Sequence, residues 1–270
     1  MNKRFVVLVE FSEFSQWLLK VAHSWAKQAE AELWVVHQSV SLAPGMGDSD
    51  IRSGIDRDSR REARKELEGM VAGLGLTGVR LRYHVTSSNP ETALAQFRRS
   101  GPLDIIIVGI KGKSWFERLL LQDTAVKLID AVDGIVAGFP MLPGTYDMDR
   151  FHIAVHSKFP LNDRALLNVL ETCSLSSRKV KLVSVLGEEE DRAALKQHMQ
   201  EICQRYADVA VMEPEILEGK VPFEVLREYV RAHQGILVVQ KGSRRLVDLF
   251  RKYFVNDVIY SAEIPVVILP

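Results

Sequence analysis

Short apolar runs alternate with amphipathic stretches along this chain, and the same order of patterns occurs twice. A short continuous apolar run that ends in polar or turn-forming residues predicts a strand buried on both faces, as in a parallel sheet. In the first half, these predicted strands cover residues 5–9, 32–40, 79–85, 104–108 and 134–139. A stretch of a different pattern separates each run from the next, so strands and helices are predicted to alternate.

The stretches between these runs carry apolar residues three or four positions apart, the spacing of one face of a helix. Ser15 is the predicted N-cap of the first helix, which runs to about Ala29. Residues 41–56 are rich in Gly, Ser and Asp, a composition typical of a mobile loop. A charged amphipathic helix is predicted at 57–72, and Pro90 opens a further short helix.

The second half repeats this order of elements. Its predicted strands cover residues 151–155, 179–186, 209–213 with 216–217, 235–239 and 265–269. Asn162 holds the helix-cap position that Ser15 holds in the first half, and Pro222 corresponds to Pro90. The chain is therefore predicted to be a tandem duplication of one α/β unit.

Strands that alternate with helices predict right-handed crossovers and an α/β fold, here two doubly wound, mostly parallel five-stranded sheets. We place one domain at 1–143 and the other at 149–270. In such sheets, ligands bind beyond the carboxyl ends of the strands, near the point where strand order reverses. The candidate sites therefore include residues 10–15 in the first half and 156–162 in the second, together with the loops after the fourth strands.

Composition narrows the classes of partner. Lys+Arg and Asp+Glu are balanced at 35 each, so no net field attracts nucleic acid or an acidic membrane surface. The two cysteines provide no disulfide framework, which favours a reducing compartment and hence the cytoplasm. The sequence contains no apolar run of about 18 residues, so no membrane span is predicted.

Several motifs, by their order and spacing, resemble the universal stress protein family in its tandem two-domain form. They are VLVEFSEFSQWLLKVA, SNPETAL, DIIIVGIKG and QDTAVKLIDAVDGIVAG in the first half, and EGKVPFEVL, GILVVQKGS and VNDVIYSAEIPVVIL in the second. The resemblance implies an adenine-nucleotide alpha hydrolase-like fold and a stress-associated regulatory or binding role with no established reaction. It also implies that residues 134–139 pair with 265–269 as an internal pseudo-dimer, and that the whole chain dimerises further.

Nucleotide-binding members of that family carry a loop of the form G-x2-G-x9-G-[ST]. Its glycines let the backbone approach phosphates, and a helix N-terminus supplies a positive field. Here Gly109 and Gly112 match the first two positions, whereas Gln122 and Asp123 replace the last pair and Thr124 lies one residue late. Because a carboxylate at Asp123 repels phosphate, the loop is interpreted as degenerate.

The family usually places an Asp after the first strand, for the ribose or a metal ion. Glu10 stands there in the first half, close to Ser12, and His156 stands there in the second. The second loop keeps Gly242 and has Val239 at the first glycine position. The nucleotide-binding candidates are therefore confined to the first half.

A basic cluster surrounds the second glycine loop, at Lys241, Gly242, Ser243, Arg244 and Arg245. It is a candidate site for an anion or a phosphorylated partner. The simpler interpretation is a solvated helix face balanced by Asp248. No aromatic residues alternate with these cations, so a nucleic-acid groove is not favoured.

Other residues have ordinary structural interpretations. His152 and His156 lie on one face of a predicted strand, but no third metal ligand is placed by the sequence, so strand-end histidines are favoured. The four tryptophans lie on apolar faces and are predicted to be core residues: Trp17, Trp25, Trp34 and Trp115. The Gly-x-Ser-x-Gly motif of a nucleophile elbow does not occur, which disfavours a hydrolase.

Three functions compete on this sequence. The favoured one is a non-catalytic interaction module that binds a protein partner and no nucleotide cofactor. The second is an ATP- or AMP-binding sensor, or a slow ATPase, that uses the first half. The third is an anion or phospho-partner binder that uses the basic cluster of the second half.

Overall fold

The computed structural model describes residues 3–39, 49–95, 104–110, 134–140, 148–157, 160–172, 179–187, 190–240 and 264–270. The first half contains β1 (Arg4–Leu8), α1 (Glu13–Gln28), β2 (Glu32–Gln38), α2 (Ser49–Gly73), β3 (Leu81–Thr86), α3 (Pro90–Ala95), β4 (Ile105–Ile110) and β5 (Ile135–Pro140). The second contains β6 (Arg150–Ala154), α6 (Asp163–Thr172), β7 (Lys179–Leu186), α7 (Arg192–Arg205), β8 (Met212–Glu218), α8 (Pro222–His233), β9 (Ile236–Gln240) and β10 (Val266–Leu269).

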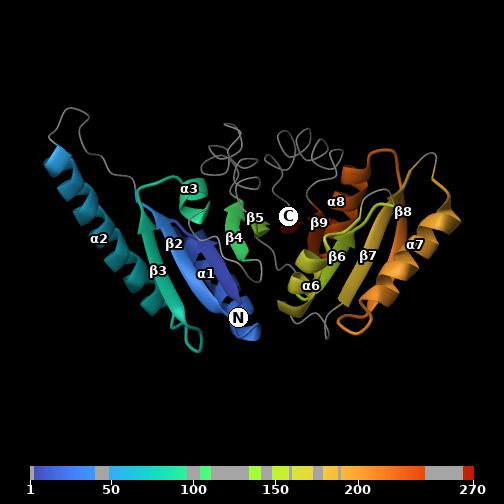
Figure 1. Cartoon of the computed structure of the whole chain (residues 1–270), viewed down its shortest axis with the longest axis horizontal. Coiled ribbons are helices and arrows are strands. Elements are labelled where there is room, and N and C mark those ends of the chain that lie inside the picture. Colours follow the sequence, from blue (N-terminus) through green and yellow to red (C-terminus); the bar gives the residue numbers. More distant parts are fainter. Residues whose placement is uncertain are drawn as a thin grey trace.

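The described strands form one 10-stranded sheet, in the order β3-β2-β1-β4-β5-β10-β9-β6-β7-β8 (Figure 1). Neighbouring strands within each half are parallel, and the orders β3-β2-β1-β4-β5 and β8-β7-β6-β9-β10 are equivalent. The prediction of two doubly wound parallel units is confirmed. Backbone hydrogen bonds join their sheets edge to edge.

The two halves meet through the antiparallel pair β5–β10. Val267 lies opposite Ala137, with Val266 opposite Gly138 and Ile268 opposite Val136, so the pairing is symmetric about its centre. All of these residues on β5 and β10 are buried. Unpaired, each strand would be an exposed apolar edge, which promotes aggregation. The predicted pairing of the last strands is therefore confirmed.

Each face of the sheet is covered by helices because residues along the strands alternate between two cores. Phe5 and Val7 of β1 face a core with apolar residues of α1, α2, α6 and α7, whereas Val6 and Leu8 face a second core with residues of α3 and α8. Trp25 of α1 crosses the junction between the halves. Its ring centroid lies 5.4 Å from that of Phe139 on β5 and 6.3 Å from that of Phe151 on β6.

Helix α2 begins at Ser49, so the prediction of a loop up to residue 56 is wrong for residues 49–56. Residues 41–48 lie outside the described residues. The acidic residue Asp50 lies in the first turn, where it interacts favourably with the helix dipole, and the pair Asp56–Arg60 is spaced for contact within a helix. Together these contacts offset the weak helix propensity of the Gly- and Ser-containing start.

The split strand predicted at 209–217 is one continuous strand, β8, which passes through Pro214. Proline is tolerated there because β8 is an edge strand, and its missing N–H is not needed by a neighbour. Of residues 144–148, which lie between the two predicted domains, only Met148 is among the described residues, and β6 begins at Arg150. Among the described helices, none is long and apolar enough to cross a membrane.

Candidate functional site

Strand order reverses between β1 and β4 in the first half and between β6 and β9 in the second. In open α/β sheets, ligands bind beyond the carboxyl ends of the strands at such a point. We call the region beyond the carboxyl ends of β1 and β4 the first crevice, and the equivalent region at β6 and β9 the second crevice. The N-terminus of α1 lies at the first crevice, and the N-terminus of α6 lies at the second.

The hydroxyl groups of the first crevice are engaged with the start of α1. Ser12, and not the predicted Ser15, is the N-cap, because its Oγ accepts a hydrogen bond from the Ser15 N–H at 3.3 Å. Ser15 is buried, and its Oγ accepts from the N–H of Glu10 at 2.9 Å. The two hydroxyl oxygens lie 3.2 Å apart. These contacts fix the short turn between β1 and α1.

A phenyl ring fills the space next to Gly109 at the end of β4. A Cβ built on Gly109 would overlap Phe14 Cε1 and lie only 3.1 Å from Phe14 Cδ1. Phe14 lies in the first turn of α1 and is buried, and its ring stacks on Trp17 with centroids 5.6 Å apart. The packing of an aromatic side chain therefore requires glycine at position 109, whether or not the loop binds phosphate.

Polar and aromatic residues line the rim of the first crevice. His37, at the end of β2, makes a hydrogen bond through Nδ1 to the carbonyl oxygen of Val9 at 3.0 Å. The Phe11 ring lies 4.3 Å from the His37 ring, and Glu10 is half-buried beside it in sequence. Contrary to the prediction of a core residue, Trp17 is 37% exposed. Within the described residues, no group of three or more His, Cys, Asp or Glu side chains could hold a metal ion.

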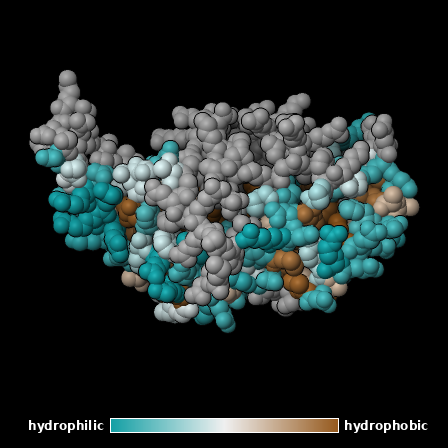
Figure 2. Space-filling view, viewed as in Figure 1, coloured by the Kyte–Doolittle hydropathy of each residue, from teal (hydrophilic) through white to brown (hydrophobic). Residues whose placement is uncertain are grey.

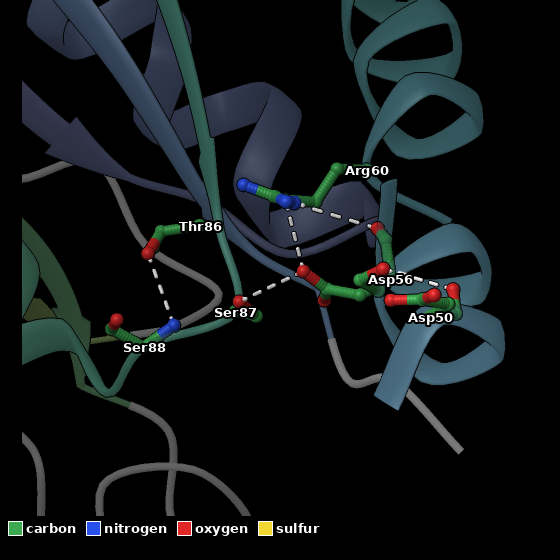
Figure 3. A network of polar contacts seen from close by, with 7 residues as sticks. Asp50, Asp56, Arg60, Thr86, Ser87 and Ser88 are labelled. Carbon is green, nitrogen blue, oxygen red and sulfur yellow. Dashed lines mark hydrogen bonds and ion pairs between the residues drawn. The ribbon is translucent and has the colours of Figure 1, made fainter. Parts of the chain in front are cut away.

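Helix α2 is tied to the carboxyl end of β3 at the outer flank of the first crevice. Figure 3 shows that Asp56 is the centre of this contact, with its Oδ2 lying 2.9 Å from Arg60 Nη2 and accepting from Ser87 Oγ at 3.5 Å. In the same loop the Ser88 N–H donates to Thr86 Oγ1 at 3.0 Å. Because this network is exposed to solvent, it positions α2 while adding little stability.

In the second crevice, three residues hold one another by hydrogen bonds. The prediction that Asn162 caps α6 is confirmed, since its Oδ1 accepts from the Ala165 N–H at 3.1 Å. The Asn162 N–H donates to Gln240 Oε1 at 2.8 Å, and Asn162 Nδ2 donates to the Pro270 carbonyl at 3.0 Å. Gln240 Nε2 donates to the same carbonyl at 2.6 Å. We call these residues, Asn162, Gln240 and Pro270, the polar clamp.

The strand register identifies Gln240 as the counterpart of Gly109. Phe5 lies opposite Ile105 in the first half, and Phe151 lies opposite Ile236 in the second. Counting four residues from each isoleucine reaches Gly109 and Gln240. The earlier alignment of Val239 with Gly109 is therefore wrong by one residue, because it was anchored on the following glycine and not on the strands.

The remaining predicted site residues lie outside the described residues. They are Gly112, Gln122, Asp123 and Thr124 of the first loop, and Lys241, Gly242, Ser243, Arg244 and Arg245 of the basic cluster. The structure thus brings Glu10, Ser12 and Gly109 to one crevice and leaves the predictions for the loops untested.

Sequence reasoning missed the roles of Phe14 and Gln240 in the crevices. The available signals were an aromatic residue in the first turn of α1 and a single polar residue at the end of an apolar strand. The prediction of a strand-end histidine is wrong for His152, which lies within β6 and is fully buried.

On the face seen in Figure 2, hydrophilic residues cover most of the described surface, and hydrophobic residues occupy small areas between them. The large apolar side chains that are exposed among the described residues are Phe11, Trp17, Ile55 and Val211. Two of them, Phe11 and Trp17, lie on either side of the α1 N-terminus in sequence. The rim of the first crevice therefore offers aromatic surface for contact.

A family model described as the universal stress protein family matches residues 1–134. A universal stress protein from Methanocaldococcus jannaschii is 26% identical over 132 residues, which cover 47% of this chain and 75% of the relative. The crystal structure of a universal stress protein from Archaeoglobus fulgidus is 14% identical, with a TM-score of 0.61 over 98% of this chain and 95% of that one.

The same fold also occurs outside proteins described by that family name. The cytoplasmic domain of a prokaryotic cation chloride cotransporter is 10% identical, with a TM-score of 0.59 over 99% of this chain and 95% of that one. At these identities, the structural similarities show the fold alone. The match over residues 1–134, together with the M. jannaschii relative, shows that the first half of this chain belongs to the universal stress protein family, and the second half repeats its strand order.

Proposed function

We propose that this chain is a tandem universal stress protein that acts in the cytoplasm as a nucleotide-free interaction module and catalyses no reaction. One observation carries the proposal: in each half, the protein's own side chains occupy the crevice where strand order reverses. The Phe14 ring covers Gly109 in the first crevice, and the polar clamp of Gln240 with Asn162 and Pro270 closes the second.

A ligand that approached Gly109 closely would have to displace the Phe14 ring. Removing a buried phenylalanine side chain from the core costs about 2 kcal/mol, before its contact with Trp17 is counted. The ligand would need to make up this difference with new contacts. Gln122 and Asp123 of the predicted degenerate loop lack the glycine and the hydroxyl group that the family pattern has at these two positions.

The polar clamp raises a different barrier in the second crevice. Its side-chain hydrogen bonds each contribute about 1 kcal/mol, and opening it leaves half-buried donors and acceptors without these partners. The Gln240 side chain also stands where a nucleotide-binding loop of this family has its first glycine. Both crevices are therefore better suited to internal packing than to a nucleotide.

The test is the nucleotide content of the purified full-length protein. We expect that mass spectrometry after denaturation finds no stoichiometric ATP or AMP. We also expect that calorimetry with either nucleotide gives no binding in the micromolar range. A stoichiometric nucleotide, or micromolar affinity for one, contradicts the proposal.

An ATP- or AMP-binding sensor, or a slow ATPase, is the rival function of the first half. Gly109, Ser12 and Glu10 lie at one crevice, which favours this candidate. It requires that ATP raises the melting temperature of the protein, and that Glu10→Ala reduces this effect. Glu13→Ala removes a nearby exposed carboxylate from the first turn of α1 and is the matched control.

A phospho-partner binder is the rival function of the second half. It uses the basic cluster at Lys241–Arg245, requires binding that weakens with added salt, and requires Arg244→Ala with Arg245→Ala to lower the affinity. Binding that is insensitive to both changes rejects this rival.

A further inference from the structure

His152 is a buried imidazole with no hydrogen-bond partner in the part of the chain that the structure describes. It lies in the middle of β6 and is 0% exposed. Among the described residues, neither Nδ1 nor Nε2 has a partner within hydrogen-bond distance. Buried polar side-chain atoms in native proteins nearly always have one, so this residue calls for a physical explanation.

The two halves differ at the site of this ring. By strand register, His152 and Gly235 correspond to Val6 and Asp104 of the first half. Arg4 and Asp104 form a part-buried ion pair there. In the second half, a Cβ on Gly235 would lie 2.5 Å from His152 Nε2, so only glycine leaves space for the imidazole.

Helix α8 covers the other side of the ring through two aromatic side chains. The Tyr229 ring meets His152 edge to face, with centroids 5.2 Å apart, and His233 stacks on Tyr229 at 4.1 Å. The Tyr229 hydroxyl donates to Glu215 Oε2 at 2.6 Å. His152 thus lies where α8 docks on the sheet.

The charges around His152 oppose its protonation. Arg150 precedes it on β6, and Lys181 lies opposite it on β7. His233 faces it from α8, while Glu215 of β8 is the carboxylate that favours a charged ring. Glu215 already binds the Tyr229 hydroxyl and Lys181, and Glu213 binds Lys181 as well.

The remaining charged residues of α8 are placed by helical spacing on its other faces. They are Glu224, Arg227, Glu228 and Arg231. Burial first, and then the neighbouring cations, lower the pKa of His152 from 6.5 to about 4. The folded second half therefore holds this imidazole neutral at physiological pH.

We propose that protonation of His152 releases α8 from the sheet. A protonated imidazole cannot remain in an apolar site without a hydrogen-bonded counter-charge. On acidification the ring leaves its site beside Gly235 and separates Tyr229 from the sheet. The buried residues Leu226 and Val230 of α8 are then exposed as an apolar surface. This device is independent of whether either crevice binds a nucleotide.

Hydrogen exchange of α8 amides in the full-length protein tests the release, after correction for the intrinsic pH dependence of exchange. Between pH 7 and 4.5, we expect protection of α8 in the wild type to fall about 50-fold. This factor follows by proton linkage from a His152 pKa of about 4 with α8 docked and the ordinary value of 6.5 with α8 released. The matched variant His152→Val carries the residue of the first half, Val6, and should keep its protection. His23→Gln removes a half-buried histidine of α1, far from α8 in the sequence, and should behave as the wild type.

Two outcomes overturn the proposal. One is an equal loss of α8 protection in His152→Val and the wild type. The other comes from an NMR titration of the His152 ring in the wild type, which needs no variant to fold. A ring that titrates near pH 6.5 while α8 stays protected shows that the charged imidazole is accommodated and releases nothing.

Discussion

The Phe14 ring rests against the α-carbon of Gly109, so the first turn of α1 packs directly on the end of β4. This contact joins residues that are 95 positions apart in the sequence (109 minus 14). The contact explains why residue 109 is a glycine without invoking a ligand. It also means that any side chain introduced at this position must displace the Phe14 ring.

Gly109→Ala should destabilise the protein by about 2 kcal/mol, because the new methyl group forces the Phe14 ring out of its site. Urea unfolding measures the change. Gly69→Ala is the matched control: no atom of the described residues lies within 4 Å of a Cβ there, and alanine favours a helix over glycine by up to about 1 kcal/mol. Equal stability of Gly109→Ala and the wild type contradicts the packing role.

Asn162→Ala should cost about 2 kcal/mol, because it removes the cap of α6 and also the bond to Pro270. Asp191→Ala is the matched control, because it removes the N-cap of α7. Within the described residues, the Asp191 side chain accepts one hydrogen bond, from the Ala193 N–H, so this variant should cost about 1 kcal/mol. The comparison of the two free energies of unfolding isolates the polar clamp. If both variants lose the same stability, the clamp contributes nothing beyond a cap.

Trp25→Ala should destabilise both halves together by about 4 kcal/mol, because the ring packs on Phe139 of the first half and Phe151 of the second. Trp17→Ala removes a partly exposed ring of the same helix and should cost less than half as much. Calorimetry should show a single transition for the wild type. Two resolved transitions in the wild type would mean that the halves fold independently.

Acid should weaken the protein through His152. Its pKa is lower in the folded chain, at about 4, than the ordinary value of 6.5. The unfolded chain therefore binds the proton first, and the stability present above pH 6.5 is lost as the pH falls toward 4. By pH 4, wild type should lose about 3 kcal/mol more than His152→Val in urea unfolding. Parallel pH profiles for the two proteins contradict this expectation.

The sequence predicts the sheet well because its strands are buried on both faces and so appear as continuous apolar runs. It predicts the start of α2 poorly, since Gly54 and Ser53 favour a loop locally while the turn-by-turn contacts of Asp50 and Asp56 favour a helix. It also places the α1 cap at Ser15, because both serines suit a helix start and only the geometry of the β1 turn selects Ser12.

The contents of the crevices could not be predicted from the sequence. Phe14 and Gly109, like Asn162 and Gln240, are brought together only when the first and fourth strands of a half pair. A motif search assigns Gly109 to a phosphate loop because it counts spacing along the chain, whereas the need for a glycine arises from a ring on another element. The same applies to Gly235 and His152.

The antiparallel contact of β5 with β10 has a consequence for how the two halves diverge. Because both strands belong to one polypeptide, their association is intramolecular and does not weaken on dilution. A pair of identical subunits must carry every substitution twice, on both sides of its axis. A covalently linked pair is free of that constraint, so its halves can differ, as they do here: the Phe14 ring packs on Gly109 in the first half and the polar clamp replaces that packing in the second, while β5 and β10 still pair symmetrically.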